Sequence, residues 1–219
     1  TFEIENGSKP AIVNRLDRDT SGLVLVAKHT LAARELGMIF ERREVEKEYI
    51  AIVTGWPDAD EWTNAQSILR EGELGPAAIW VRQVVHAAGR ECLTRFKVEH
   101  RFEVGGRNHA MIRCFPETGR MHQIRVHLAN DGFPIVGDKL YAGDGSEYLE
   151  WMRDGWTSNL QKKLHLPRHA LHASRLSLMW NGRLMDWRIG LPADLAAFVC
   201  GDASRHDPRV VEWSRHDAK

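Results

Sequence analysis

The stretch Thr94–Val104, which reads TRFKVEHRFEV, indicates the fold class. Its apolar residues alternate with polar ones, as they do in a strand with one buried face. Strand character recurs on either side, and the predicted strands are 44–54, 79–86, 94–104, 109–115, 171–180 and 184–189. Long strands with few helices between them predict an α+β fold, built on a mixed, mainly antiparallel sheet with flanking helices.

Three segments carry helical patterns. Thr30 is placed to cap a helix that runs through about Arg43. The buried side of this helix is predicted to comprise Leu31, Leu36, Ile39 and Phe40. A second helix is predicted at 121–130, and a short third helix begins at Pro192. The segment 143–163 has no clear period, so we expect a long surface excursion there.

The composition is that of an ordinary globular protein. The 219 residues include 30 basic and 30 acidic side chains, so the net charge is zero and favours no polyanionic partner. Basic residues nevertheless gather in 107–127 and 159–185, which leaves open a basic face on a neutral protein. Three dispersed cysteines form no disulfide or zinc pattern. No segment resembles a signal peptide or a membrane span, and we expect a cytoplasmic location.

The segment 13–28, VNRLDRDTSGLVLVAK, places concentrated charge before an apolar run. The run, 23–27, is predicted to be a strand covered on both faces. Asp17 stands just ahead of the turn signal DTSG, so it is either a turn carboxylate or an ionised nucleophile or base. The second role needs a cation beside it, because burial alone disfavours the charged form of a carboxylate. Arg18 and Asp19 are expected to be structural.

A candidate cation lies in the segment 119–130, GRMHQIRVHLAN. On a helix, Ile124 lies on the apolar side and Arg125 points away from it. Arg125 is therefore either an exposed helix arginine or the partner of a carboxylate. His122 and His127 are five residues apart, which does not suit one helical face, and no metal site is predicted.

Tyr49 lies on the predicted strand 44–54. It is either a core tyrosine whose hydroxyl reaches the rim of the sheet, or a ring that stacks on a flat substrate. Spacing alone does not decide between these two interpretations.

Five segments occur in one order along the chain, and together they resemble the RluA-type pseudouridine synthases. They are NRLDRDTSGLVLVAK (14–28), EKEYIAIVTG (46–55), ETGRMHQIRVHLA (117–129), GFPIVGDKLY (132–141) and ALHASRL (170–176). The stretches 56–90 and 202–219 carry none of the resemblance. It implies a mixed sheet around a central cleft, and an enzyme that isomerises specific uridines of ribosomal or transfer RNA to pseudouridine. It also implies that the base is flipped out, without cofactor or metal.

The resemblance assigns roles residue by residue. Asp17 matches the essential catalytic aspartate, and Arg125 matches the basic residue that pairs with it. Tyr49 matches the tyrosine that stacks on the target base. Arg15 matches the arginine that enters the RNA stack where that base leaves it. Two apolar positions near the site are matched by Leu16 and Ile124.

The chain departs from the family pattern in two places. Asn14 stands where members usually have His, which affects local RNA contacts more than chemistry. Lys9 and Pro10 lie directly upstream of the motif rather than tens of residues ahead of it. We expect a single catalytic domain over 1–219 that lacks its N-terminal strand and has no separate N-terminal RNA-binding module. Substrate choice is then expected to depend on this domain and on the unmatched stretch 56–90.

The expected partner is RNA, with no membrane, no obligate protein partner and a monomeric state. A catalytically silent RNA-binding protein of the same fold is the main alternative. A glycoside-cleaving hydrolase could use Asp17 with Asp19 or Glu117, but it would have no use for Tyr49 and Arg15. A purely structural module would have no affinity for RNA. Whether Asp17 acts as a nucleophile or as a base is not decided by the sequence.

Overall fold

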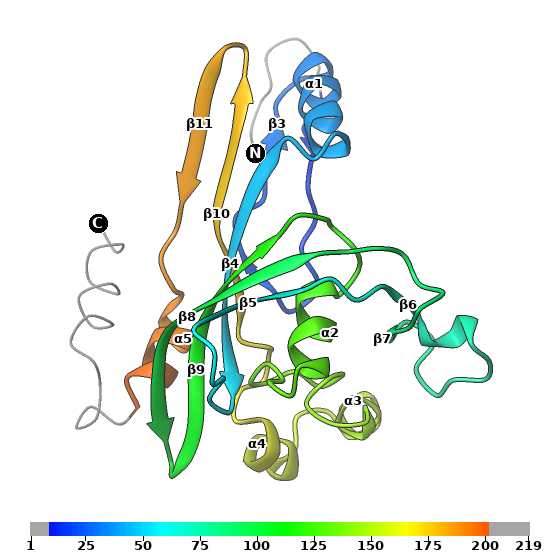
Figure 1. Ribbon diagram of the computed structural model, residues 1–219, viewed down its shortest axis with the longest axis vertical. Helices are drawn as coiled ribbons and strands as arrows, with labels where there is room; N and C mark the ends of the chain where they lie inside the picture. The colour runs from blue at the N-terminus through cyan, green and yellow to red at the C-terminus, as the bar shows by residue number, and fades with distance from the viewer. Residues whose placement is uncertain (1–8, 202–219) are drawn as a thin grey trace.

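The computed structural model describes residues 9–201 (Figure 1). Residues 1–8 lie outside the described part, so the expectation about an N-terminal strand stays untested. The elements in chain order are β1 (Ala11–Ile12), β2 (Ser21–Gly22), β3 (Val26–Ala27), α1 (Thr30–Glu41), β4 (Val45–Thr54), β5 (Glu61–Asn64), β6 (Ile68–Arg70), a 3-10 turn (Glu71–Glu73), β7 (Gln83–Val85), β8 (Thr94–Val104), β9 (Arg107–Pro116), α2 (Gln123–Asn130), α3 (Ser146–Asp154), α4 (Ser158–Leu164), β10 (Leu171–Trp180), β11 (Arg183–Arg188) and α5 (Ala193–Val199).

The main sheet confirms the predicted fold class. Its strands lie in the order β11–β10–β4–β9–β8–β5, and all of these neighbours are antiparallel. The short strand β2 joins β10 in parallel, which makes the sheet mixed. β8 and β10 have the bounds predicted from the sequence. Two further small sheets pair β1 with β3 and β6 with β7.

The strand β4 forms the centre of the hydrophobic core. Its four residues Ile50 to Val53 are each at most 2% exposed, because β9 and β10 pair with both edges and other elements cover both faces. The core cluster around them includes side chains of α2 and α5. Figure 1 shows α2 over the middle of the sheet, with α3 and α4 below it. The carboxyl-terminal half of β4 is therefore firmly packed, and Tyr49 directly precedes it.

The predicted doubly covered strand at 23–27 is wrong. Only Val26 and Ala27 form a strand there, and Val24 and Val26 are 44% and 48% exposed. Leu23 and Leu25 instead pack into a second cluster beside α1. Side chains of the apolar run point alternately to the core and to solvent. The valine-rich composition therefore predicted more buried residues than the structure has.

The helix α1 differs from the prediction at its start and in one buried residue. His29 is the capping residue, and its Nδ1 accepts a hydrogen bond of 3.2 Å from the Ala32 backbone N–H. Leu31 is 61% exposed, so its predicted burial is wrong, and Ala32 and Leu36 are the buried residues. Ala32 and Leu36 are four residues apart and share one face of the helix, and Leu31 lies off that face.

The two regions without clear patterns are both ordered. The segment 143–163, expected as a surface excursion, contains α3 and α4. The stretch 57–90 adds β5 to the edge of the main sheet and forms the β6–β7 hairpin. Of the predicted strand 79–86, only β7 is formed. The hairpin packs against α2 through a third apolar cluster that contains Ile68, Ile79 and Val126.

Candidate active site

The helix α2 places Arg125 at the centre of a buried ion-pair chain. His122 precedes the helix in the left-handed conformation, with φ of 58°. The Arg125 side chain is only 6% exposed. Its Nε and Nη2 donate to the two oxygens of Asp138 at 2.7 and 2.9 Å, and its Nη1 donates to Asp17 Oδ2 at 3.0 Å. The guanidinium is thus held by one carboxylate and presented to another.

Asp17 lies on a loop that closes on itself. Asn14 joins the two ends of this loop. Its Oδ1 accepts from the Leu25 backbone N–H at 2.7 Å, and its amide donates to the Leu23 carbonyl at 3.4 Å. The Leu23 N–H donates to the Ala173 carbonyl at 3.0 Å, which ties the loop to β10. Asn14 therefore has a structural role in closing this loop.

The carboxylate of Asp17 is directed at Arg125 and not at the DTSG turn. The turn is closed by the Thr20 backbone N–H, which donates to the Asp17 carbonyl at 3.0 Å. The Asp17 side chain is 26% exposed, so it has one side on the ion pair and one side open. Asp19, expected from the sequence to be structural, forms an ion pair of 2.8 Å with Lys139.

Asp138 is fully buried and keeps the ion-pair chain charged. Burial alone would raise the pKa of Asp138, but the charge and hydrogen bonds of Arg125 outweigh burial and lower this pKa to about 2. Burial likewise opposes the charge of Arg125, and the two carboxylates raise the pKa of Arg125 above its ordinary value. The three groups together carry one negative charge, and Asp17 is the member that faces the open side.

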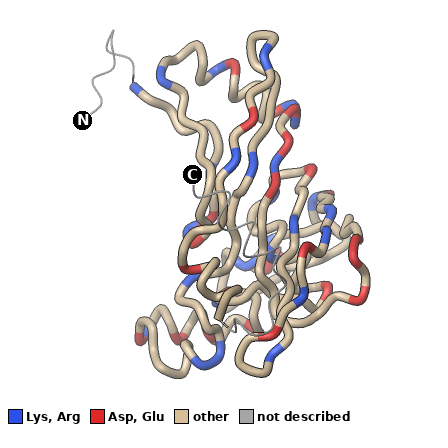
Figure 2. The backbone as a smooth tube through the Cα atoms, turned by 90° about the vertical axis from the view of Figure 1, so that its left-hand side faces the viewer, with Lys and Arg blue, Asp and Glu red and all other residues tan. Residues whose placement is uncertain are grey.

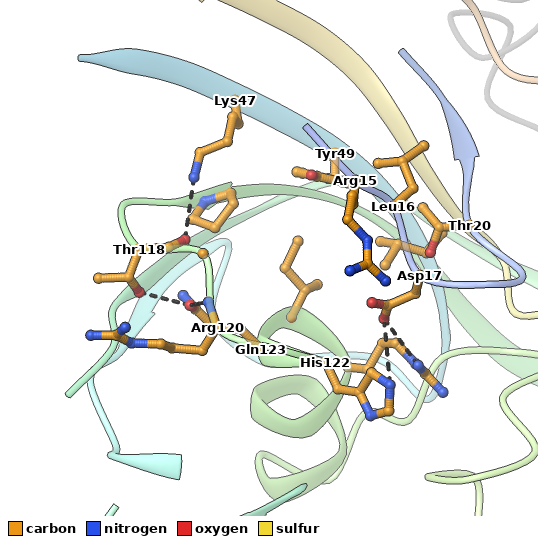
Figure 3. A pocket seen from close by; sticks show the side chains of 15 residues that line it. Arg15, Leu16, Asp17, Thr20, Lys47, Tyr49, Thr118, Arg120, His122 and Gln123 are labelled. Carbon is orange, nitrogen blue, oxygen red and sulfur yellow. Dashed lines mark hydrogen bonds and ion pairs between the residues drawn. The ribbon is translucent and has the colours of Figure 1, made fainter. Parts of the chain in front are cut away.

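A cavity of about 120 Å³ lies in front of Asp17 (Figure 3). Every site residue predicted from the sequence lines it: Arg15, Leu16, Asp17, Tyr49, Ile124 and Arg125. These residues come from the Asn14 loop, from β4 and from α2, so the fold brings together three distant segments. Their individual roles toward a substrate stay predictions.

The Tyr49 ring forms one wall of the cavity. Burial raises the pKa of Tyr49 to about 12, and the Asp17 charge adds to this effect. The hydroxyl is therefore neutral at physiological pH and able to donate a proton or a hydrogen bond. The flat face of the ring can hold a planar ligand in the cavity that Asp17 also lines.

Two histidines beside the ion-pair chain are uncharged. Burial and the nearby Arg125 lower the pKa of His122 and of His169 to about 4 each. His122 Nε2 lies 4.0 Å from Asp17 Oδ2, and its Nδ1 shares a hydrogen bond of 2.8 Å with the Tyr141 hydroxyl. Asp17 therefore has one charged partner, Arg125, within ion-pair distance among residues 9–201.

The opposite side of the cavity carries two cations that the sequence analysis did not single out, Lys47 and Arg120. Lys47 Nζ donates to the Thr118 carbonyl at 3.3 Å, and Arg120 Nε donates to the Glu91 carbonyl at 3.3 Å. Neither forms an ion pair with a carboxylate of the described chain. Burial lowers the pKa of Lys47, and the nearby Arg43 lowers it further. The cavity thus has an acidic end at Asp17 and a basic end at Lys47.

Sequence reasoning missed Asp138. Its signal was present in the segment GFPIVGDKLY, where Asp138 follows an apolar run and Gly137. Gly137 has φ of +78°, and a Cβ there would lie 2.0 Å from the Arg168 carbonyl oxygen. Glycine at 137 allows two backbone segments to pack closely, and the charged side chain of Asp138 is buried directly after this contact.

The basic segments of the sequence do not form a uniformly basic face. Acidic residues from other elements neutralise them, as in the ion pairs Arg113–Glu48, Arg113–Glu99, Arg168–Asp194, Arg175–Glu46 and Arg175–Asp186. Figure 2 shows basic and acidic positions interspersed along the long strands. The sequence alone suggested more local positive charge than the fold has. Folding places acidic residues from distant segments beside several of these basic side chains.

No group of three or more His, Cys, Asp or Glu side chains within residues 9–201 is arranged to hold a metal ion. His127, one of the two histidines considered for a metal, shares hydrogen bonds with Thr94 Oγ1 and Cys92 Sγ. In the same part of the chain, no helix is both long and apolar enough to cross a membrane.

Comparison with known proteins identifies the family. The profile described as RNA pseudouridylate synthase matches residues 2–130, which include Asp17, Tyr49 and Arg125. The chain belongs to the RNA pseudouridylate synthase family. The family resemblance expected from the five sequence segments is thereby confirmed.

Curated relatives of this chain include proteins named ribosomal large subunit pseudouridine synthase D. The protein of Buchnera aphidicola from Acyrthosiphon pisum is 35% identical over 189 residues, covering 85% of this chain and 56% of the relative. The Escherichia coli K12 protein is 34% identical over 193 residues, covering 87% and 55%. The Nitrosomonas europaea protein is 33% identical and is covered to 51%. The chain thus spans about half the length of these relatives.

Solved structures agree on the pseudouridine synthase fold. Human RNA Pseudouridylate Synthase Domain Containing 1 aligns with a TM-score of 0.71 at 24% identity, covering 94% of this chain and 80% of that one. Human RNA Pseudouridylate Synthase Domain Containing 4 aligns with a TM-score of 0.69 at 23% identity, covering 90% and 77%. At this identity the likeness concerns the fold alone.

Proposed function

We propose that this chain isomerises specific uridines in structured RNA to pseudouridine. The observation that carries the proposal is the Asp17 carboxylate, held at 3.0 Å by an Arg125 guanidinium that the buried Asp138 fixes from behind. The relatives named above act, by their names, on the RNA of the large ribosomal subunit. We therefore place ribosomal RNA ahead of transfer RNA as the substrate.

The reaction must exchange one bond for another without net gain or loss of atoms. The bond from ribose C1′ to uracil N1 breaks, the ring turns, and C1′ joins C5. The C5 proton is lost and N1 takes up a proton. Asp17 either attacks the sugar or the ring, or removes a sugar proton, and each of these routes needs an ionised carboxylate. The ion pair with Arg125 supports that ionised form and fixes its direction.

A uridine inside a helix or stack cannot turn, so it must first leave the stack. Flipping costs roughly a few kcal/mol, and stacking on an aromatic ring returns roughly 1–3 kcal/mol per base. The Tyr49 ring in the cavity wall is suited to supply that stacking, and the exposed Arg15 is suited to fill the vacated place. The detached uracil must also be shielded, because water at the sugar would give hydrolysis instead of isomerisation.

The proposal extends to the partners and setting of the reaction. The partner is RNA, and the enzyme acts as a monomer in one catalytic domain, with no cofactor and no membrane. A cytoplasmic location fits the ribosomal RNA named for the relatives. The stretch 56–90 is proposed to contribute to substrate choice, because the β6–β7 hairpin that it forms packs against α2 next to the cavity.

The Asp17→Asn variant tests the proposed function. It keeps the shape of the side chain and removes its charge, so we expect pseudouridine formation to fall by at least about a thousandfold while RNA affinity changes little. The assay is mass spectrometry or chemical mapping of pseudouridine in transcribed large-subunit ribosomal RNA, with a transfer RNA pool in parallel. Asp58→Asn, at an exposed position away from the cavity, is the matched control and retains wild-type turnover.

Two results would contradict the proposal. Retained turnover in Asp17→Asn would overturn the role of this carboxylate. RNA binding by the wild type without any product would favour the catalytically silent binding protein, and release of free uracil would favour a hydrolase.

A further inference from the structure

A second cavity, of about 170 Å³, neighbours the catalytic cavity. His122 and Arg125 line both cavities, so the two lie next to each other. The second cavity is bounded by the charged segment after Asp17, by the corner after Asp138 and by α3. Its lining beyond the shared wall includes Arg18, Lys139, Tyr148, Trp151 and His169.

The charged segment 15–19 serves both cavities. Arg15 and Asp17 line the catalytic cavity, whereas Arg18 and Asp19 line the second one. Residues that looked merely structural in the sequence therefore face a pocket of their own. A polymer that places one unit against Asp17 passes next to Arg18, because the two residues are consecutive.

The side chains around Trp151 differ in how firmly they are held. Lys139 Nζ lies 5.0 Å from the Trp151 ring centroid and is fixed by Asp19 and by the Pro167 carbonyl. The Arg18 guanidinium lies 4.7 Å from the same centroid. Arg18 is exposed and forms no ion pair with any described residue, so its guanidinium is free to move off the ring or to cover a ligand placed on it.

The chemistry of the lining suits a planar aromatic ring that is attached to a negatively charged polymer. Asp19 is neutralised by Lys139, and the buried His169 is uncharged at neutral pH, which leaves Arg18 as the unpaired charge. The rings of Trp151 and Tyr148 add flat apolar surface, together with Leu140. Stacking on tryptophan beneath a guanidinium is a mode by which proteins hold unpaired nucleobases.

We infer that this second cavity holds one nucleobase of the substrate RNA, from a nucleotide that flanks the target uridine. The base lies against Trp151, and Arg18 stacks on its outer face. The inference rests on the proposed function, because it takes the strand that presents the target uridine as the ligand. Occupation of this cavity contributes to the choice of which uridine is modified.

The test uses fluorescence of 2-aminopurine, which falls when the base stacks on an aromatic ring. The probes are ten-nucleotide RNAs with one central uridine and 2-aminopurine at one of the two positions on either side. They are titrated with full-length Asp17→Asn, so that turnover does not interfere. We expect strong quenching at one flanking position and weak quenching at the other three.

Two variants locate the quenching in the second cavity. Trp151→Ala in the Asp17→Asn background removes the stacking face, and we expect about 5- to 100-fold weaker binding of the responsive probe and loss of its quenching. Arg18 is exposed, so Arg18→Ala is not expected to disturb folding. We expect this variant also to weaken the binding of the responsive probe and its quenching. Met152→Ala is the matched control, because Met152 is a 59% exposed apolar residue on the same helix that does not line the cavity.

The outcomes separate the inference from the proposed function. Quenching that is equal at all four positions, absent at all four, or unchanged in both Trp151→Ala and Arg18→Ala overturns the second cavity as a base site. The proposed function is judged separately, by pseudouridine formation in ribosomal RNA by the wild type. A protein that shows the position-dependent quenching yet makes no pseudouridine has the base site and lacks the proposed activity.

Discussion

At the scale of single residues, Asp138 is the side chain on which the geometry of the site depends. It is fully buried, and it binds Arg125 through two hydrogen bonds, whereas Asp17 binds the same guanidinium through one. Bidentate pairs of this kind fix both the position and the plane of an arginine. Asp17 is thereby left as the more exposed and less constrained carboxylate, as a group that reacts with a substrate should be.

The variant Asp138→Asn tests this division of roles. Removing one partner of an isolated buried ion pair costs about 3–5 kcal/mol, and in this variant Arg125 keeps the partly exposed Asp17 as its remaining counter-ion. We expect the free energy of unfolding to fall by up to that amount, and turnover to fall as Arg125 loses its orientation. Urea unfolding and the pseudouridine assay measure the two effects.

Asp154→Asn provides the comparison for Asp138→Asn. Asp154 pairs with its neighbour Arg153 on the surface, where solvent screens the pair, so little change in stability is expected. Equal stability of Asp138→Asn and the wild type would show that the buried pair does not hold Arg125 in place.

The residues of the site were predictable to different degrees. Asp17, Tyr49 and Arg125 could be named because their segments resemble a known family. Charge crowding alone favoured a turn carboxylate at Asp17 and an exposed helix arginine at Arg125. Asp138 could not be named, because its value comes from full burial beside Arg125, and burial depends on contacts between segments far apart in the chain.

At the scale of elements, the loop that carries Asp17 depends on a close contact with β10. Gly22 has φ of +118°, and a Cβ at this position would lie 2.3 Å from the Ala173 carbonyl oxygen. Both the backbone conformation and the lack of space exclude larger residues. The contact sets where the loop leaves the sheet, and hence where Asp17 meets Arg125.

Gly22→Ala is expected to destabilise the protein and to reduce turnover, because backbone atoms of β10 cannot yield as a flexible side chain would. Gly37→Ala in α1 is the matched control, since nothing lies within 4 Å of a Cβ there and its φ is ordinary. Alanine in place of a helical glycine is expected to stabilise by about 0.5–1 kcal/mol. Thermal melts of both variants measure the difference, and equal melting temperatures would contradict the importance of the contact.

Long strands were predictable from the sequence, and short elements were not. β8 and β10 have 11 and 10 residues, long enough for a period of two to emerge. β2 and β3 have two residues each, and no periodicity can be read from two positions. Tertiary contacts with β10 and β1 define them instead, so composition at 23–27 predicted a five-residue strand where only the two residues of β3 form one.

At the scale of the whole molecule, buried uncharged histidines link stability to pH. Burial lowers the pKa of six histidines below their ordinary value: His109, His122, His127, His165, His169 and His172. For His122 and His169 the pKa in the folded protein is about 4. In the unfolded chain a histidine titrates near about 6.5. Between these values the unfolded chain binds more protons than the folded protein.

The free energy of unfolding is therefore expected to be constant above about pH 7 and to fall as pH falls from about 6.5 toward 4. Each such histidine contributes at most about 1.4 kcal/mol per pH unit within this window. His169→Gln should make the decline shallower, and His86→Gln, at an exposed position, should leave it unchanged. Urea unfolding at pH 7.5, 6.0 and 5.0 checks this, and a pH-independent wild type would contradict it.

The balance of charge affects how strongly the protein is attracted to RNA in general. Several basic side chains are neutralised by acids of other elements, as Arg113 is by Glu48 and Arg175 by Asp186, whereas Arg15, Arg18, Lys47 and Arg120, which line the two cavities, form no ion pair within residues 9–201. A strongly cationic protein would bind most cellular RNA non-specifically through its phosphates. Under the proposed function, the zero net charge limits such non-specific attraction, and the four unpaired cations act mainly on an RNA strand that reaches the cavities.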